Sequence, residues 1–356
     1  MFSTVQDWSS ITDRESISKY LPFRDFETNT GIFATNDDGF GILIECSPLM
    51  GVDKNVESAI SSALSILPDN TAIQIMLLAS PNVTGIVDNW HVQKQRAFDD
   101  PLCHDIAYSY KQFLESKIKS QISNNFRAPI RNFRLLISIK VGGKDNKPTL
   151  LSKLISFDFK ALFSKDKEGT NKFDKSELFK KYSELIQAKD QFIGSLQQAY
   201  LNPRLVDADK AIAFYYEILN MNHDLRDIPK WDGSDINNFI FANDNKIVQK
   251  ENELIVDKLH VKTLSVREYP EELGIFDVIR YAGDAINNQN HASPFLITLN
   301  VVKLGEKAKS EITRRAALTS SQQMPYNLFP KLKYIHRDLN FAKKKKKKGA
   351  APYYIS

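Results

Sequence analysis

The fold is decided by two apolar runs, Gly31-Ile32-Phe33-Ala34-Thr35 and Phe40-Gly41-Ile42-Leu43-Ile44-Glu45. Both are short and rich in β-branched and aromatic residues, as strands are. They are joined by Asn36-Asp37-Asp38-Gly39, whose Asp-Gly step suits the positive φ of a tight turn. The sequence therefore predicts a β-hairpin at the start of the folded part.

A helix and a third strand follow the hairpin. Residues 53–67 carry apolar side chains at helical spacing, Asp53 is a candidate N-cap, and Pro68 ends the segment. Residues 72–79 form an apolar run long enough for a buried strand. This ββαβ order predicts a small layered structure with the helix over one face of the sheet. Its single core should hold Phe33, Phe40, Ile42, Ile60, Leu64, Ile75 and Leu77.

The rest of the chain alternates between helical and strand patterns. We expect helices at 105–122, 175–200, 207–221 (capped by Asp207), 276–285, 306–320 and 331–348, and strands at 133–139, 246–248, 253–256, 261–267 and 294–303. Residues 164–176 indicate a surface connection, and 352–355 have strand composition without room for a full element.

The predicted class is α+β, with small mixed or antiparallel sheets covered by helices, a central long-helix region and no P-loop domain. The predicted division is an extension at 1–20, a ββαβ-type module at 21–145, a mainly helical region at 146–230, a second α+β module at 231–342 and a polybasic tail at 343–356.

The positive charge of the chain resides in that tail. The formal net charge of the chain is +5, and the six consecutive lysines of the tail contribute six positive charges. They could bind anionic lipid or nucleic acid weakly and without specificity. They are Lys343, Lys344, Lys345, Lys346, Lys347 and Lys348.

No catalytic, cofactor-binding or metal-binding residue is assigned from the sequence. Gly142-Gly143-Lys144 lacks the spacing of a phosphate-binding loop, and Asp145 stands where a Mg²⁺-holding Ser or Thr would be, so a turn is favoured. The six histidines, His91, His104, His223, His260, His291 and His336, show no metal-ligand spacing. Two cysteines without C-x-x-C spacing suggest a reducing compartment and no disulfide.

Other candidate sites have simpler structural interpretations. Ser47-Pro48 and Ser80-Pro81 follow strands, where a nucleophile could stand, but such dipeptides also make turns. Asp37-Asp38 lacks calcium-loop spacing and suits a solvated turn. The aromatic and basic residues between Tyr108 and Lys117 could stack on single-stranded nucleic acid, but their spacing favours a buried aromatic stripe with a charged outer face.

Several short blocks occur in a familiar order. They are Leu21-Pro22-Phe23-Arg24-Asp25-Phe26, Ser47-Pro48-Leu49-Met50-Gly51, Leu77-Leu78-Ala79-Ser80-Pro81-Asn82, residues 263–270 and residues 293–299. Together they resemble the N-terminal half of the TraC family of F-type conjugative type IV secretion ATPases, over about residues 21–341. The resemblance implies docking and assembly at the cytoplasmic side of the bacterial inner membrane, with other secretion components, a separately encoded motor half or further copies of the chain as partners.

The family's motor lies beyond this half. Full-length members bind ATP and Mg²⁺ in a RecA-like domain, and none of those site residues has a position here, so we expect no hydrolysis and no cofactor. The lysine run and short tail suggest a truncation before that domain. Two other readings stay open, a polybasic adaptor at a membrane surface or on nucleic acid, and a decayed mobile-element product.

Overall fold

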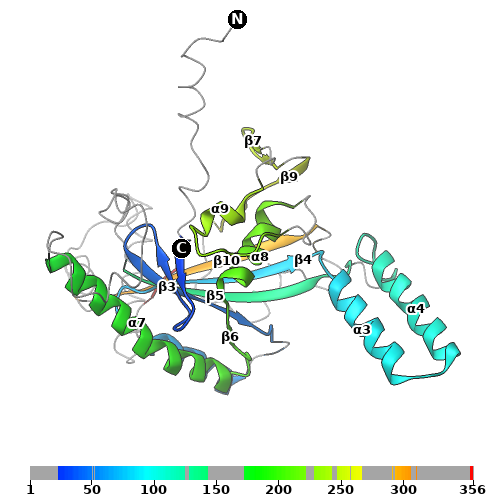
Figure 1. Ribbon diagram of the computed structural model, residues 1–356, viewed down its shortest axis with the longest axis horizontal. Coiled ribbons are helices and arrows are strands. Elements are labelled where there is room, and N and C mark those ends of the chain that lie inside the picture. Colours follow the sequence, from blue (N-terminus) through cyan, green and yellow to red (C-terminus); the bar gives the residue numbers. More distant parts are fainter. Residues whose placement is uncertain are drawn as a thin grey trace, which may run out of the picture.

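One antiparallel sheet organises the molecule. The computed structural model describes residues 23–49, 51, 53–124, 128–142, 172–221 (side chains from 178), 228–242, 247–256, 258–266, 291, 293–305, 310 and the backbone of 353–355. The strand order is β1-β2-β3-β5-β4-β10-β11, and β6 pairs with β3 (Figure 1). The strands are β1 (Phe23–Glu27), β2 (Ile32–Thr35), β3 (Gly39–Cys46), β4 (Ala72–Ser80), β5 (Asn132–Gly142), β6 (Arg204–Leu205), β10 (Phe295–Lys303) and β11 (Tyr353–Ile355). The α+β class predicted from the sequence is therefore confirmed.

The predicted β2–β3 hairpin is present. Asp38 supplies the positive φ of the turn, +64°, and the Gly39 amide donates to Thr35 Oγ1 at 3.1 Å. Asp37 accepts a hydrogen bond from Thr35 and forms an ion pair with Lys140 of β5. The paired aspartates thus form a turn, as predicted.

Two helices cover one face of this sheet. Helix α2 (Lys54–Ile66) is capped by Asp53, whose side chain accepts from the Val56 amide at 2.8 Å. Helix α7 (Lys172–Gln198) packs on α2, β3 and β5. It begins three residues earlier than predicted, inside the segment expected to be a surface connection. The core between these helices and the sheet includes Phe40, Ile42, Ile44, Ile139, Leu185 and Phe192.

The opposite face of the sheet is covered as well. Helices α8 (Ala208–Leu219) and α9 (Asn237–Ile240) close a second core that includes Phe33, Leu43, Leu136 and Phe214. Asp207 caps α8, as predicted, by accepting from the Lys210 amide at 2.9 Å. The prediction of a single core containing Phe33 is wrong. Successive strand residues point to opposite faces, so Phe33 lies in the second core while Ile32 and Ala34 lie in the first.

Strand β10 joins parts of the chain that are far apart in sequence. It pairs with β4 from Phe295 opposite Ala79 to Val302 opposite Ala72. At its end the buried Lys303 side chain donates to the Ser65 carbonyl of α2 at 2.7 Å. Elements from the predicted segments 21–145, 146–230 and 231–342 therefore share one sheet and its two cores, while the exact boundaries stay predictions.

Three short strands form a second sheet: β7 (Ile247–Gln249), β8 (Leu254–Val256) and β9 (Leu259–Val261). The strand predicted at 261–267 is wrong, because β9 ends at Val261 and the described residues after it, 262–266, are exposed and belong to no strand. Residues 353–355, expected to be too few for an element, form β11 by pairing with β10. The helix predicted at 276–285 lies outside the described residues, as do those at 306–320 and 331–348 apart from Ser310.

Candidate docking surface

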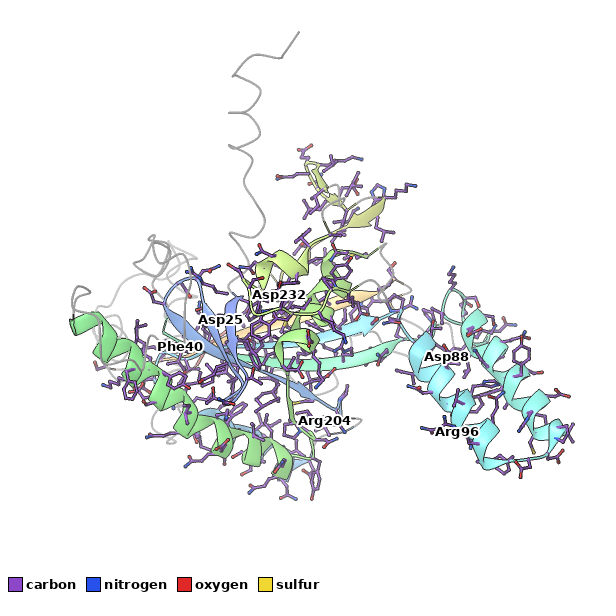
Figure 2. The ribbon with its side chains drawn as sticks, viewed as in Figure 1. Asp25, Phe40, Asp88, Arg96, Arg204 and Asp232 are labelled. Carbon is purple, nitrogen blue, oxygen red and sulfur yellow. The ribbon has the colours of Figure 1, made fainter. Side chains whose placement is uncertain are left out.

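A pair of helices projects from one end of the sheet. Helices α3 (Thr84–Ala97) and α4 (Pro101–Ser116) connect β4 to β5 and pack mainly on each other. The strand ends that carry them are adjacent, since Ser80 is paired with Asn132. Figure 2 shows Phe40 in the sheet body, with Asp88 and Arg96 out on the projecting pair. We call this pair the helical hairpin.

Local sequence explains the turn of the hairpin. Asp100 accepts from the Leu102 amide at 2.9 Å, and Pro101 occupies the first turn of α4, where a missing N–H costs nothing. A ring nitrogen of His104 lies 2.6 Å from the Phe98 carbonyl oxygen and ties the loop to α4. The helix predicted at 105–122 is shifted in the structure, since α4 begins at Pro101 and ends at Ser116, and α3 was not predicted from the sequence.

A polar contact fixes how α4 faces α3. Lys111 Nζ lies 2.5 Å from Asp88 Oδ1 and 3.8 Å from Glu115 Oε1. The hydrogen bond to Asp88 raises the pKa of Lys111. Ala107, one turn earlier, is buried against α3. These residues turn the opposite side of α4 outward.

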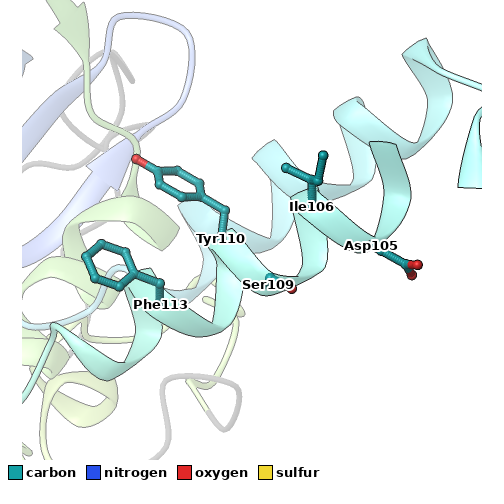
Figure 3. A pocket seen from close by; sticks show the side chains of 5 residues that line it. All are labelled: Asp105, Ile106, Ser109, Tyr110 and Phe113. Atoms are coloured by element: carbon teal, nitrogen blue, oxygen red, sulfur yellow. The ribbon is translucent and has the colours of Figure 1, made fainter. Parts of the chain in front are cut away.

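That outward side is apolar. Leu102 is 64% exposed, Ile106 60%, Tyr110 49% and Phe113 43%. Figure 3 shows Ile106, Tyr110 and Phe113 around a shallow depression that Ser109 and Asp105 also line. The prediction of a buried aromatic stripe with a charged outer face is therefore wrong, because the aromatic side chains of α4 touch α3 only along one edge and stay about half exposed. We call Leu102, Ile106, Ser109, Tyr110 and Phe113 the α4 face.

Ring contacts hold part of the α4 face in place. The Trp90 ring of α3 lies 5.3 Å from that of Tyr110, and the Tyr110 and Phe113 rings are stacked at 6.1 Å. Lys117 Nζ lies 5.4 Å from the Phe113 ring centroid. Such a row presents a preformed surface, which lowers the entropic cost of binding.

The sequence motifs considered for catalysis have structural roles here. Ser80 is fully buried and donates to Glu217, and its Oγ accepts from the Asn82 amide at 2.9 Å. Ser47 is exposed, and its amide donates to the Leu201 carbonyl at 2.7 Å in the strand exit. Both Ser-Pro dipeptides therefore lie where the chain leaves a strand, β3 or β4, and their serines make structural contacts.

A polar network crosses the second face of the sheet near Ser80. Arg134 donates to Glu45 at 2.8 Å and to Glu217 of α8 at 3.2 Å, and its guanidinium lies 5.1 Å from the Phe214 ring centroid. Because Glu217 bonds both Arg134 and Ser80, this network anchors α8 to β4 and β5. Its groups are satisfied by one another, which suits a structural role.

The remaining candidates lie apart from one another. His91 is buried against the Tyr108 ring, and His260 Nδ1 lies 3.0 Å from Glu253 Oε2. Among the described residues no three His, Cys, Asp or Glu side chains gather as a metal site would require. Gly142 has φ +79°, as a turn glycine has, whereas Gly143, Lys144, His223, His336 and Lys343–Lys348 lie outside the described residues.

A family model described as TraC protein matches residues 17–356. The chain belongs to the TraC family. It is therefore a protein of conjugative type IV secretion, as the resemblance of its sequence blocks implied. A search of curated proteins returned no match. Within the described part of this TraC-family chain, no helix is both long enough and apolar enough to span a bilayer.

Proposed function

We propose that this TraC-family chain is a docking and assembly region of a conjugative type IV secretion ATPase, that it acts on the cytoplasmic side of the inner membrane, and that these residues do not themselves hydrolyse ATP. The observation that carries the proposal is the α4 face, an apolar surface held away from a body that already has two cores. Contiguous exposed apolar side chains are typical of protein interaction sites.

The position of the helical hairpin supports this role. It is inserted between two central strands, β4 and β5, whose long pairing fixes its base. A projection on a rigid base reaches a partner without disturbing either core. The proposal also assigns partners among the inner-membrane secretion components, which hold the chain peripherally.

The second candidate function is the polybasic adaptor. Six consecutive lysines, Lys343–Lys348, would each contribute up to about 1 kcal/mol near an anionic leaflet. Such binding weakens steeply with salt, because exposed charges are screened within about 10 Å at 0.1 M salt. A contact made by apolar side chains depends much less on the salt concentration.

The two functions separate in a recruitment experiment. The full chain is expressed in bacteria with and without the secretion components, and its share in the inner-membrane fraction is measured at low and high salt. The matched variant replaces all six lysines with glutamine and keeps the length. Docking through the folded body predicts recruitment that requires the secretion components, resists salt and survives the six substitutions. Loss of recruitment in the glutamine variant would establish the adaptor instead.

A further inference from the structure

The charges at the two ends of α4 are arranged with opposite signs. Asp99 and Asp100 are exposed just before the helix, and Asp105 is exposed in its second turn. Lys117 and Lys119 follow its last turn. Glu115 in the last turn is the exception, and it lies near Lys111, away from the α4 face. The apolar α4 face therefore lies between an acidic end and a basic end.

Two copies of this charge pattern are complementary when the α4 helices pair in one relative direction. If two α4 helices pair in parallel, each acidic end meets an acidic end and each basic end meets a basic end. If they pair antiparallel, acidic ends meet basic ends and the two helix dipoles also oppose favourably. The same surface then serves both partners, as in the two-fold interfaces of homodimers.

We propose that the α4 face binds the α4 face of a second copy of this chain, antiparallel and across a two-fold axis. With the axis between Ser109 and Tyr110, Ile106 of one copy lies opposite Phe113 of the other. Asp99 and Asp100 then lie near Lys117 and Lys119 of the second copy. Ser109 is the small residue at the crossing point and lets the helices approach closely.

The arrangement also accounts for the side chains around the axis. Leu102 lies opposite the aliphatic stem of Lys117 of the second copy, which covers apolar surface while its ammonium reaches toward the acidic end of the helix. Tyr110 is already oriented by Trp90, so little freedom is lost on pairing. Each copy contributes the same anchors, two aromatic rings flanked by two aliphatic side chains.

The size of the contact sets its strength. A helix of 16 residues is about 24 Å long, and one helix pair falls below the roughly 1,600 Å² of a standard stable interface. The dimer should therefore dissociate on dilution.

The proposed α4 pairing deepens the assembly role proposed above and rests on it. Cross-linking of the full chain tests the geometry of this pairing. In a Cys103→Ala background, Ser109→Cys lies beside the two-fold axis and should form a disulfide-linked dimer under mild oxidation. Cys46 is buried, and burial raises the pKa of its thiol to about 12, so it does not compete. Lys180→Cys on α7, whose side chain is 76% exposed, is the control for random collision. Equal rates for the two cysteines would overturn the proposal.

Sedimentation of the purified full chain tests which side chains drive the association. The weight-average sedimentation coefficient should rise with protein concentration, and Ile106→Glu should abolish the rise, while Val92→Glu, at an exposed position on α3, should leave it unchanged. Asp99→Lys and Lys119→Asp should each weaken association, and the double variant should restore it, because its charges are exchanged and its net charge is unchanged. A chain that stays monomeric at every concentration, or a double variant that is not rescued, would overturn the antiparallel pair.

The tests are independent of the recruitment experiment. They use purified protein without secretion components, so self-pairing could hold while recruitment fails, or the reverse. Binding of monomeric chain to anionic vesicles that Ile106→Glu abolishes would overturn the proposal in favour of a membrane-facing surface.

Discussion

Lys111 of α4 and Asp88 of α3 form an ion pair with the Nζ and Oδ1 atoms 2.5 Å apart, on the side of α4 opposite the exposed Ile106 and Phe113. In most two-helix units the apolar side chains face inward and the charges face water. Here the hairpin buries Val87, His91 and Ala107 beside that half-exposed ion pair, while Ile106 and Phe113 on the other side of α4 face water. Since the hairpin leaves these two apolar side chains largely exposed, it points to their burial against a partner.

Truncation of a buried aliphatic side chain and of an exposed one should change the free energy of unfolding by very different amounts. Leu185 of α7 is fully buried in the first core, so Leu185→Ala should lower the free energy of unfolding by about 2 to 5 kcal/mol. Ile106→Ala should change it by less than about 0.5 kcal/mol in the monomer, since that side chain is mostly in water. Denaturant titrations at low protein concentration would measure both. Equal effects would mean that Ile106 packs against the body.

Alkaline pH should destabilise the folded chain. Burial raises the pKa of Cys46 from 9.0 to about 12, and burial with a hydrogen bond to Glu27 raises that of Tyr182 from 10.0 to about 12. Burial also raises the pKa of Tyr215. Below pH 9 these groups are protonated in both the folded and unfolded states. Above it the unfolded chain releases protons that the folded chain keeps, so the free energy of unfolding falls from pH 9 to 12.

The matched variant for this pH dependence is Cys46→Ala. It removes one of the titrating groups, so its unfolding free energy should decline less steeply with pH than that of the parent chain. Urea titrations at a series of pH values would measure the slope. An unchanged slope would show that Cys46 does not contribute.

Nucleotide binding should be undetectable in the purified chain. A P-loop holds phosphates with consecutive backbone amides, a lysine and a Mg²⁺-binding hydroxyl, and Gly142-Gly143-Lys144 followed by Asp145 does not supply this set. Calorimetry with ATP and Mg²⁺ should give no saturable heat. Phosphate release that Lys144→Ala abolishes would show that a nucleotide site exists after all.

The sequence was informative where local chemistry decides structure. The Asp38 turn, the Asp53 and Asp207 caps and the strands at 72–80 and 132–142 follow from residues close in sequence. The second core was not predictable in this way. An apolar strand such as β3 is equally consistent with burial on one face or on both, and only β10 and α8, from distant parts of the chain, settle the matter.

The α4 face shows more clearly what the sequence alone does not predict. The spacing of Ile106, Tyr110 and Phe113 correctly predicts that they share one side of a helix. Periodicity alone does not state whether that side faces a core or water. The contact between Lys111 and Asp88 decides the question, and it depends on α3, which the sequence patterns did not reveal. The family assignment, in contrast, came from blocks whose order is visible in the sequence and was confirmed.

The most direct test of the central claim replaces the helical hairpin. Ser80 and Asn132 are paired neighbours, so an Asn-Gly turn in place of residues 81–131 should join β4 to β5 directly. No described residue of segment 81–131 belongs to either core. The thermal unfolding midpoint of the shortened chain should therefore stay close to that of the parent chain. The measurement is its share in the inner-membrane fraction of cells that carry the secretion components. An assembly role for the hairpin predicts that recruitment falls to the level of cells without those components, and full recruitment of the folded, shortened chain would contradict it.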